Sequence, residues 1–372
     1  MLWERALPKS AIDVIGPAFE HTRQQLLQPF RFGQWARLAL LGLATGELTA
    51  GGSSNGGLRS LASMPSRFPH PSQNLVDPKD IFRGLDPAIL GMMVAVLVMG
   101  GIILFVVWTY MASVSRFVLF ESVLRKRAEL SRGWARWHRQ GMRFFGWNLA
   151  MAIVSMAVGI VLLIPLFVPL VAAARSGHFD PSILLAFLPW LLVLAVFGFL
   201  MILIAVLAKD FVVPIMAVED VGVIEGWRRL LAMMTEAKGS YAAYVGTKVV
   251  LSISASVVFG IFSGILAFLL LLPVAVAGVA VFLFARGAGL TWDVFTITAA
   301  MVVGAVLLVV LMYVIALVCV PIAVFFPAYA MYFLAERLPR LHGLLYPAPI
   351  PVAGSATLPH PPPIPPTPEP IG

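Results

Sequence analysis

Five stretches of this chain are long, apolar and free of charged residues, and they limit its possible folds more than any other feature. They cover residues 88–114, 149–174, 182–208, 249–285 and 295–320. Each is longer than the roughly twenty apolar residues that one helical crossing of a bilayer needs. Charged residues make up only 12% of the chain, against roughly a quarter in a typical soluble domain. The sequence therefore predicts an all-α integral membrane protein.

Short motifs recur along the chain, which indicates an internal repeat. Residues 31–35 (Arg-Phe-Gly-Gln-Trp) resemble 143–147 (Arg-Phe-Phe-Gly-Trp), Gly-Trp-Ala-Arg at 133–136 resembles Gly-Trp-Arg-Arg at 226–229, and Val-Pro-Ile occurs at 213–215 and 320–322. Recurrence at a fixed period is the signature of repeated supersecondary units. We predict three parallel helical hairpins, in units of about residues 11–114, 115–208 and 211–320. An interfacial amphipathic helix precedes each hairpin, and a terminal interfacial segment follows the last one.

Three hairpins require a sixth span, for which residues 34–52 are the candidate. This stretch is short and contains Arg37 and Glu47, but Arg37 lies close enough to one end for its side chain to reach the interface. Two questions stay open: whether residues 34–52 cross completely, and whether residues 249–285 are one span or a span plus a re-entrant segment. The predicted organisation is a cytoplasmic N-terminus with an interfacial helix (1–33), a membrane domain (34–340), an external Gly/Ser/Pro-rich loop (53–86) and a disordered Pro-rich tail (347–372).

A strongly basic loop sets the expected orientation. Residues 115–145 contain eight Arg and Lys against two Glu, so they hold six of the eight net positive charges of the chain. The positive-inside rule places such a loop in the cytoplasm, with both termini on the same side of a bacterial inner membrane. We expect anionic lipid head groups, rather than nucleic acid, as its partners. The candidate contacts are Arg125, Lys126, Arg127, Arg132, Arg136 and Arg139.

Three acidic residues near the ends of predicted spans are candidate functional positions. Glu121 can be superposed on Glu219 or Asp220 if a gap is allowed. A catalytic or ion-binding carboxylate is one interpretation, and local pairing with Arg116, Arg228 or backbone amides is the one we favour. Lys248, near the start of a span, is expected to extend its ammonium to the interface.

A stripe of small residues is the one packing feature that the sequence specifies. Ser252, Ser256, Gly260 and Gly264 recur every four residues and so share one side of a helix. Small residues allow a neighbouring helix to approach closely in lipid. We expect that neighbour to belong to the same chain, with a second copy as the alternative.

Motifs for chemistry are missing. The six histidines are scattered without metal-ligand spacing, and no catalytic or phosphate-binding motif occurs. Ionisable residues are almost absent from the centres of the spans, where transporters place their ion paths. The sequence therefore predicts a protein that is not an enzyme and that uses no cofactor or metal. A membrane accessory, scaffold or lipid-related protein is the first hypothesis, followed by a transporter of a small or amphipathic solute and by an intramembrane enzyme.

Residues 11 to about 340 resemble a group of uncharacterised bacterial membrane proteins. The resemblance is carried by Pro-Phe-Arg-Phe-x-x-Trp at 29–35, Phe-Val-Leu-Phe-Glu at 117–121 and Val-Pro-Ile at 213–215. These proteins are similar to the membrane domain of some glycerophosphodiester phosphodiesterases. The catalytic barrel of those enzymes has no counterpart in this sequence, so the resemblance implies an architecture but no catalytic residues.

Overall fold

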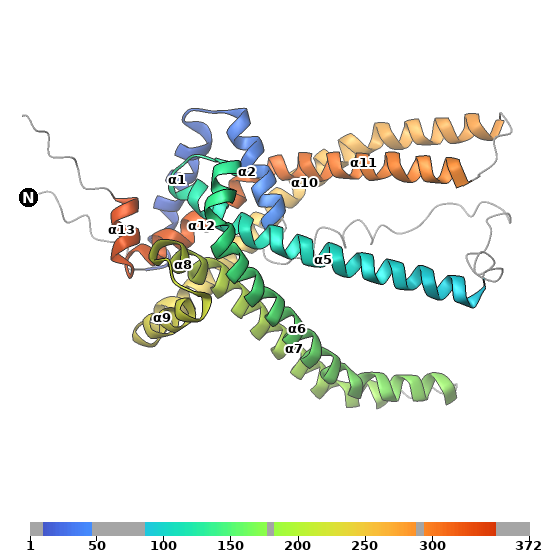
Figure 1. Ribbon diagram of the computed structural model, residues 1–372, viewed down its shortest axis with the longest axis horizontal. Coiled ribbons are helices and arrows are strands. Elements are labelled where there is room, and N and C mark those ends of the chain that lie inside the picture. Colours follow the sequence, from blue (N-terminus) through green and yellow to red (C-terminus); the bar gives the residue numbers. More distant parts are fainter. Residues whose placement is uncertain (1–9, 47–85, 177–181, 288–293, 347–372) are drawn as a thin grey trace, which may run out of the picture.

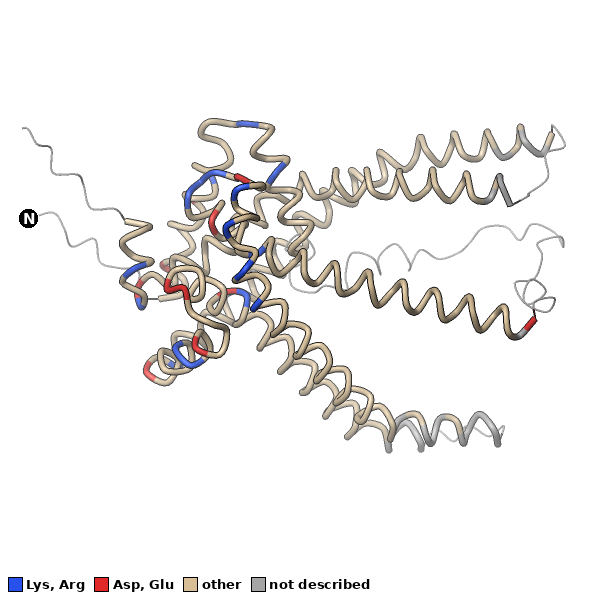
Figure 2. Tube along the Cα trace, viewed as in Figure 1, with Lys and Arg blue, Asp and Glu red and all other residues tan. Residues whose placement is uncertain are grey.

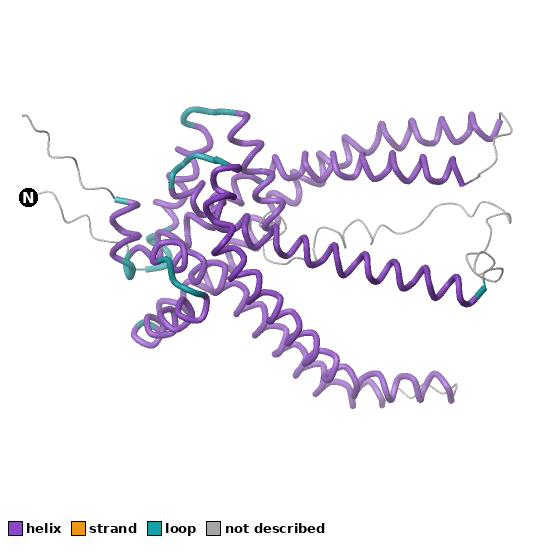
Figure 3. The backbone as a smooth tube through the Cα atoms, in the orientation of Figure 1, coloured by secondary structure: helices purple, strands orange, loops and turns teal. Residues whose placement is uncertain are grey.

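The computed structural model describes residues 10–46, 86–176, 182–287 and 294–346, and within these ranges the chain is helical, with no strand (Figure 3). The elements are α1 (Ile15–Leu27), α2 (Phe32–Thr45), α5 (Pro87–Leu124), α6 (Leu130–Ser176), α7 (Ser182–Leu207), the π-helix η2 (Ala208–Val212), α8 (Val213–Glu219), α9 (Val223–Glu236), α10 (Lys238–Gly287), α11 (Val294–Val318), α12 (Val320–Ala335) and α13 (Pro339–Leu345). The all-α prediction is confirmed. The predicted tail and, apart from Asp86, the predicted external loop lie outside the described residues.

The helices form a compact head from which three arms extend (Figure 1). We define the arms as residues 88–112 of α5, 149–206 of the hairpin α6–α7, and 253–310 of the hairpin α10–α11. No described side chain in these ranges is buried, whereas the core of the molecule lies wholly in the head. The arms diverge as they leave the head, so each arm exposes most of its surface.

Apolar and charged residues separate along the direction that leads from the head to the ends of the arms. Five helical segments are long and apolar enough to cross a membrane: Ala88–Leu124, Leu130–Pro165, Phe187–Glu219, Lys238–Val281 and Thr298–Val318. Charged residues gather in the head (Figure 2), and the described parts of the arms are nearly free of them. The five strong span predictions are therefore confirmed by length and composition. The segment 249–285 lies within the single helix α10, which continues through Pro273.

The candidate sixth span has a different form in the part that the structure describes. The helix α2 ends at Thr45, and Gly46 follows in the left-handed conformation, with φ of 73°. Fourteen residues make a helix of about 21 Å, shorter than the ~30 Å hydrocarbon core. Leu38, Ala39 and Leu41 are buried against the rest of the head. Residues 47–52 lie outside the described residues.

The head is built around α12, which we expected to be a terminal interfacial segment. Instead, α12 is buried on nearly every side and contacts α1, α2, α5, η2 and α13. A helix that is apolar all round, without an amphipathic face, belongs in a core. The segment therefore packs against protein on nearly all sides instead of presenting an amphipathic face, and its position relative to the membrane stays a prediction. Its aromatic residues Phe326, Tyr329 and Phe333 are almost completely buried.

Three glycines allow the helices of the head to approach closely. A Cβ atom at Gly141 of α6 would lie 2.9 Å from the Cα atom of Val114 in α5, and one at Gly133 would lie 2.9 Å from Val118. In the second Gly-Trp motif, a Cβ atom at Gly226 would lie 3.0 Å from Val212. The two Gly-Trp motifs thus have equivalent neighbours, because Val118 and Val212 each follow a phenylalanine at the end of an arm.

Candidate functional site

A π-helical turn presents the most unusual polar groups of the head. At the end of α7, the N–H of Val213 donates to the carbonyl of Ala208, five residues back, so the helix is widened. Pro214 follows and has no N–H with which to continue the α-helical pattern. Single π-turns inside helices occur frequently at functional sites. This one carries two consecutive ionisable residues, Lys209 and Asp210.

Asp210 forms a buried ion pair with Lys248. The two residues are only 4% and 8% exposed, and the Asp210 carboxylate also accepts a hydrogen bond of 3.0 Å from the Tyr244 hydroxyl. The Lys248 ammonium lies 5.7 Å from the centre of the Phe326 ring. An isolated buried charge is very costly, so each group requires the other. The expectation that Lys248 reaches the interface is wrong, because Asp210 holds its ammonium inside the head.

The reasoning from sequence missed this pair, although a signal for it existed. Asp210 stands two residues after the apolar stretch 182–208, where an acidic residue normally marks the membrane surface. Tyr244 and Lys248 are four residues apart in α10, so both face the same neighbour. An acceptor for these two donors had to lie on another helix. Nothing in the sequence alone shows that the end of α7 is that neighbour.

Aromatic rings pack around the ion pair and fix its position. The Tyr244 ring stacks on Tyr329, with centroids 5.0 Å apart and planes inclined by 10°. Phe211, next to Asp210, contacts Tyr244 at 4.8 Å and Phe333 at 5.8 Å. These contacts join η2, α10 and α12 into one unit. The π-turn is consequently held from two sides, by a charge on α10 and by rings on α12.

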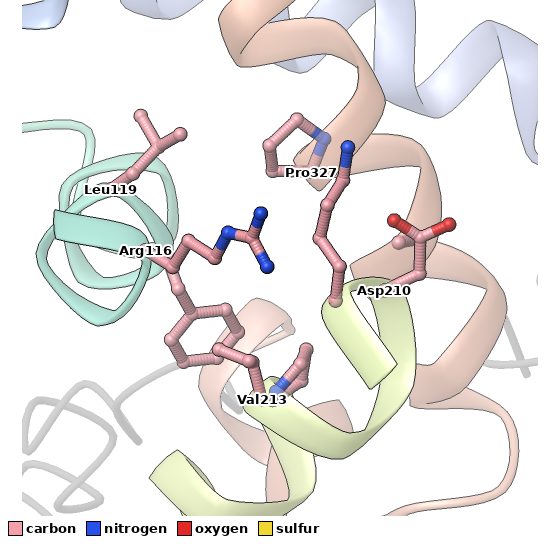
Figure 4. A pocket seen from close by; sticks show the side chains of 9 residues that line it. Arg116, Leu119, Asp210, Val213 and Pro327 are labelled. Carbon is pink, nitrogen blue, oxygen red and sulfur yellow. The ribbon is translucent and has the colours of Figure 1, made fainter. Parts of the chain in front are cut away.

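A small cavity of about 30 Å³ lies on the other side of the π-turn (Figure 4). Its lining consists of Arg116, Leu119, Phe120, Lys209, Asp210, Val213, Pro214, Pro327 and Ala330. One water molecule needs about 10–15 Å³ of such volume, so the cavity can hold a few small polar atoms. Figure 4 shows the Arg116 guanidinium extending from α5 into the space between Val213 and Pro327. The lining therefore combines two cations and one carboxylate with an apolar wall.

The cavity lies at the level where the arms join the head. On α5, side chains are exposed or half-buried up to Ala112 and buried from Ser113 to Ser115. On α7, burial begins at Leu207. Arg116 and Lys209 come directly after these two boundaries. Both cations are thus placed where the apolar surface of the arms ends.

The three predicted acidic positions are not brought together into one site. Glu121 accepts a hydrogen bond of 2.8 Å from Arg136, pairs with Arg125 at 3.1 Å and also accepts from the indole of Trp137. Glu219 forms an ion pair with Arg229. Asp220 accepts from the amide of Gln140. Local pairing is therefore what the geometry provides, with arginines other than the Arg116 and Arg228 that we expected.

The six predicted lipid-contacting residues are all exposed and lie along the α5–α6 connection and the start of α6. Several of them also hold the head together. Arg125 and Arg136 share Glu121, Arg132 pairs with Glu129 at 3.6 Å, and the Lys126 ammonium donates to Gln24 at 2.8 Å. Arg127 and Arg139 are exposed as well.

Polar side chains of α1 and α2 bind the carbonyl groups at the end of α5. The last carbonyls of a helix have no partner within it. Here Gln25 donates to Ser122 at 3.0 Å, Gln34 to Lys126 at 2.9 Å and Arg37 to Ala128 at 3.2 Å, while His21 lies 2.9 Å from the Val123 oxygen. We call His21, Gln25, Gln34 and Arg37 the clamp. It fixes the basic connection to the N-terminal helices.

His21 is the titratable member of the clamp. Its Nε2 faces a carbonyl oxygen, which can only accept, so we assign the proton to Nε2 and let Nδ1 accept from the Tyr332 hydroxyl at 3.2 Å. Burial lowers the pKa of His21, the Val123 carbonyl opposes this effect, and the charge of Lys126 adds to it. Burial also raises the pKa of Tyr332 to about 12, which keeps its hydroxyl protonated. The neutral imidazole is therefore the form that the head accommodates.

The small-residue stripe is not a tight contact within the described chain. Ser252 is buried, but Ser256, Gly260 and Gly264 are exposed, and a Cβ atom on either glycine would meet no described atom within 4 Å. The neighbouring side of α10, which includes Ser263, is the half-buried one, and its hydroxyl lies 3.6 Å from the Cys319 sulfur. The contact inside the chain is thus made one residue away from the predicted stripe, at Ser263 instead of Gly264.

Five apolar helices of membrane-crossing length, joined to a charged head, define a multi-pass integral membrane protein. Residues 9–344 match the model of a family of unknown function, DUF7544, and the chain belongs to that family. No curated protein and no solved structure matches the chain. The resemblance to uncharacterised membrane proteins is confirmed at this level, and the likeness to a phosphodiesterase membrane domain stays a prediction.

Proposed function

We propose that this protein is a non-enzymatic accessory or scaffold protein of the bacterial inner membrane, which organises lipid around a cytoplasmic head. One observation carries the proposal: three apolar arms diverge from a single charged head (Figure 1). Apolar side chains gain little by leaving hydrocarbon for one another, so such arms are stable in lipid without packing together. Lipid, rather than protein, then fills the space between them.

The charge distribution supports a cytoplasmic head. The exposed basic residues of the α5–α6 connection lie in the head, on the side to which the positive-inside rule assigns cytoplasm. Anionic lipids enrich the surface of the cytoplasmic leaflet, and each nearby Lys or Arg contributes about 1 kcal/mol of attraction. The head thus faces the leaflet with which its charges interact favourably.

Connectivity supports six crossings and three hairpins. The helix α2 ends in the head, whereas α5 begins at the far end of its arm (Figure 1). The arm over residues 88–112 is about 37 Å long at 1.5 Å per residue. With this arm across the membrane, Gly46 and Asp86 lie on opposite sides of it, which supports a sixth crossing. The equivalent contacts of the two Gly-Trp motifs favour the three repeat units in the same way.

A transporter of a small or amphipathic solute is the second candidate. A polar cavity between the hairpins would favour it, but the cavity that we describe is small and lies in the head. A tightly packed three-hairpin core would favour a rigid scaffold, and the diverging arms do not provide one either. The arrangement agrees best with a protein that contacts many lipids.

Reporter fusions test the topology on which the proposal depends. A green fluorescent protein after Gly372 should fluoresce, and alkaline phosphatase inserted within residues 53–86 should be active. A C-terminal fusion that is active only in the periplasm would refute the six-span arrangement. Turnover of a phosphodiester by the purified protein, abolished by Glu121→Gln or Glu219→Gln in a folded variant, would refute the non-enzymatic role.

A further inference from the structure

We propose that the turn between α1 and α2 inserts Leu27, Phe30 and Phe32 into the cytoplasmic leaflet, next to anionic lipid head groups. We call these three residues the apolar tip. The inference rests on the proposed function, because it requires the head to face that leaflet. The sequence predicts an interfacial helix within residues 1–33, and the apolar tip specifies the side chains through which this segment contacts lipid.

The helix α1 turns polar side chains towards the core of the head. Three of its five buried residues are polar, namely His21, Thr22 and Gln25, whereas Phe19 and Leu27 are exposed. A helix at a boundary between protein and water normally places its apolar stripe inwards and its polar residues outwards. The arrangement of α1 therefore indicates that its outer side faces something other than water.

The apolar tip is as exposed as the arms. The side chains of Leu27, Phe30 and Phe32 are 56%, 59% and 63% exposed, and those of Phe167 and Phe199 in the α6–α7 arm are 59% and 65% exposed. A single exposed apolar residue is ordinary at a protein surface, whereas a group of them marks a binding surface. The tip places three large apolar side chains within six residues of the chain.

A tryptophan places the apolar tip at the level of the membrane surface. The Trp35 ring lies 5.5 Å from the Phe30 ring, and its indole N–H donates to the Leu317 carbonyl at 2.7 Å. Leu317 is one residue before the end of the membrane-crossing segment Thr298–Val318. Tryptophan is enriched at this interfacial level of membrane proteins. The tip directly precedes Trp35, so it emerges where α11 reaches the lipid head groups.

Exposed cations beside the apolar tip select an anionic leaflet as the partner. Arg31 stands between the two phenylalanines, and Gln34 donates to the Lys126 carbonyl at 2.9 Å, so the basic α5–α6 connection lies next to the tip. In an anionic leaflet the rings enter hydrocarbon while the cations meet the head groups. A second copy fits less well, because a symmetric contact between two tips brings like charges close together.

Spin labels on the full-length protein in nanodiscs of phosphatidylglycerol test the apolar tip. The variants Leu27→Cys and Phe32→Cys provide the attachment points, and wild-type protein treated in the same way corrects for labelling of Cys319, which is buried. Oxygen concentrates in hydrocarbon and a nickel chelate stays in water, so the collision rates of a label with these two reagents report its surroundings.

The matched control is Leu344→Cys. Leu344 is 56% exposed, like Leu27, but it lies in α13, at the end of the head away from the arms (Figure 1). Compared with the label at position 344, the labels at positions 27 and 32 should collide more often with oxygen and less often with the nickel chelate.

A second measurement uses wild-type protein and so covers the case in which a cysteine variant does not fold. The protein would be reconstituted with a phosphatidylglycerol that carries a photoactivatable diazirine in its acyl chain, and the adducts would be mapped by mass spectrometry of peptides. Adducts should appear on the arms, which serve as the positive control, and on residues 27–32, but not on α13. With the phosphatidylcholine analogue, the ratio of tip adducts to arm adducts should fall, because the neighbours of the tip are basic.

Several results would overturn the inference. Labels at positions 27 and 32 that meet the nickel chelate as often as the label at 344 would show water at the tip, and labels shielded from both reagents would show protein there, such as a second copy. Adducts confined to the arms would exclude insertion, and an equal ratio with both lipids would exclude the anionic partner. Any of these results, in a protein whose reporter fusions show the expected topology, refutes the tip alone. Fusions with the opposite orientation refute the proposed function instead.

Discussion

Removing the Lys248 charge should destabilise the head strongly, because it deletes the cation with which the buried Asp210 carboxylate is paired. Breaking a buried ion pair by deleting one partner costs about 3–5 kcal/mol. Asp210 is only 4% exposed, so water cannot replace the ammonium. The hydrogen bond from Tyr244 at 3.0 Å remains and offsets part of the loss. We therefore expect Lys248→Met to lower the free energy of unfolding by about 3 kcal/mol, the lower end of that range.

The double variant Asp210→Asn/Lys248→Met should recover most of this stability. Replacing both partners removes the buried charge, and such replacements are often neutral or stabilising. The asparagine side chain can still accept from Tyr244. Unfolding in mixed micelles with increasing dodecyl sulfate, followed by tryptophan fluorescence, would give the free energies of both single variants and the double variant. Lys238→Met, which removes an exposed lysine at the start of the same helix α10, is the control and should change little.

A double-mutant cycle separates a coupled pair from two independent residues. The structure requires a large coupling between positions 210 and 248. If Lys248→Met is as stable as wild type, or if the two single effects add without coupling, Lys248 reaches the lipid interface instead. In that case our description of the π-turn as held by a charge on α10 would be wrong.

Three further predictions concern the clamp, the glycines and the stripe. Burial lowers the pKa of His21, so below about pH 6.5 the unfolded state binds more protons than the folded state, and stability should fall as the pH decreases through that value. The variant His21→Gln should flatten this pH dependence. An unchanged pH profile in the variant would contradict the buried neutral imidazole. Gly141→Ala should destabilise the protein by about 1–3 kcal/mol through overpacking against Val114. Gly146→Ala on the same helix, where a Cβ atom meets nothing within 4 Å, is the control and should be neutral or stabilising by up to ~1 kcal/mol. Equal effects of the two variants in thermal unfolding would argue against the α5–α6 contact. Gly260→Leu should leave the stability of the monomer unchanged, and light scattering would reveal a second copy at the stripe if this variant converts a dimer to monomer.

The arms could be predicted from the sequence, because lipid exposure requires nothing more than length and apolarity. Residues 88–114 or 295–320 satisfy that condition without any neighbour. The head could not be predicted in the same way, since its helices bury themselves against partners distant in the chain. The helix α12 has the composition of a membrane-crossing segment but is 16 residues long and lies at the centre of the head. The apolar surface of α12 would be equally compatible with lipid and with protein around it, so the sequence alone does not show which of the two covers this helix.

The partners of the polar residues were even harder to predict from the sequence. Glu121 and Arg136 are close in sequence, and their pairing follows from the short α5–α6 connection. Asp210 and Lys248 are 38 residues apart, and only the tertiary contact between η2 and α10 joins them. Arg37 was interpreted as a residue that reaches the interface, yet it binds the Ala128 carbonyl in the clamp. In each case the sequence indicated that a charged residue needed a partner, but tertiary contacts determined which partner it has.

The division into arms and head has an energetic consequence for the whole molecule. Association of apolar helices in lipid gains little from the hydrophobic effect, and the described arm residues bury almost nothing against each other. The stability that fixes the tertiary structure must then come from the head, through the core around α12, the clamp and the Asp210–Lys248 pair. We therefore propose that the arms adjust their separation to lipids between them, as the function proposed above requires. Arms that do not pack together suit that role better than they suit a transporter, whose spans must pack around a path.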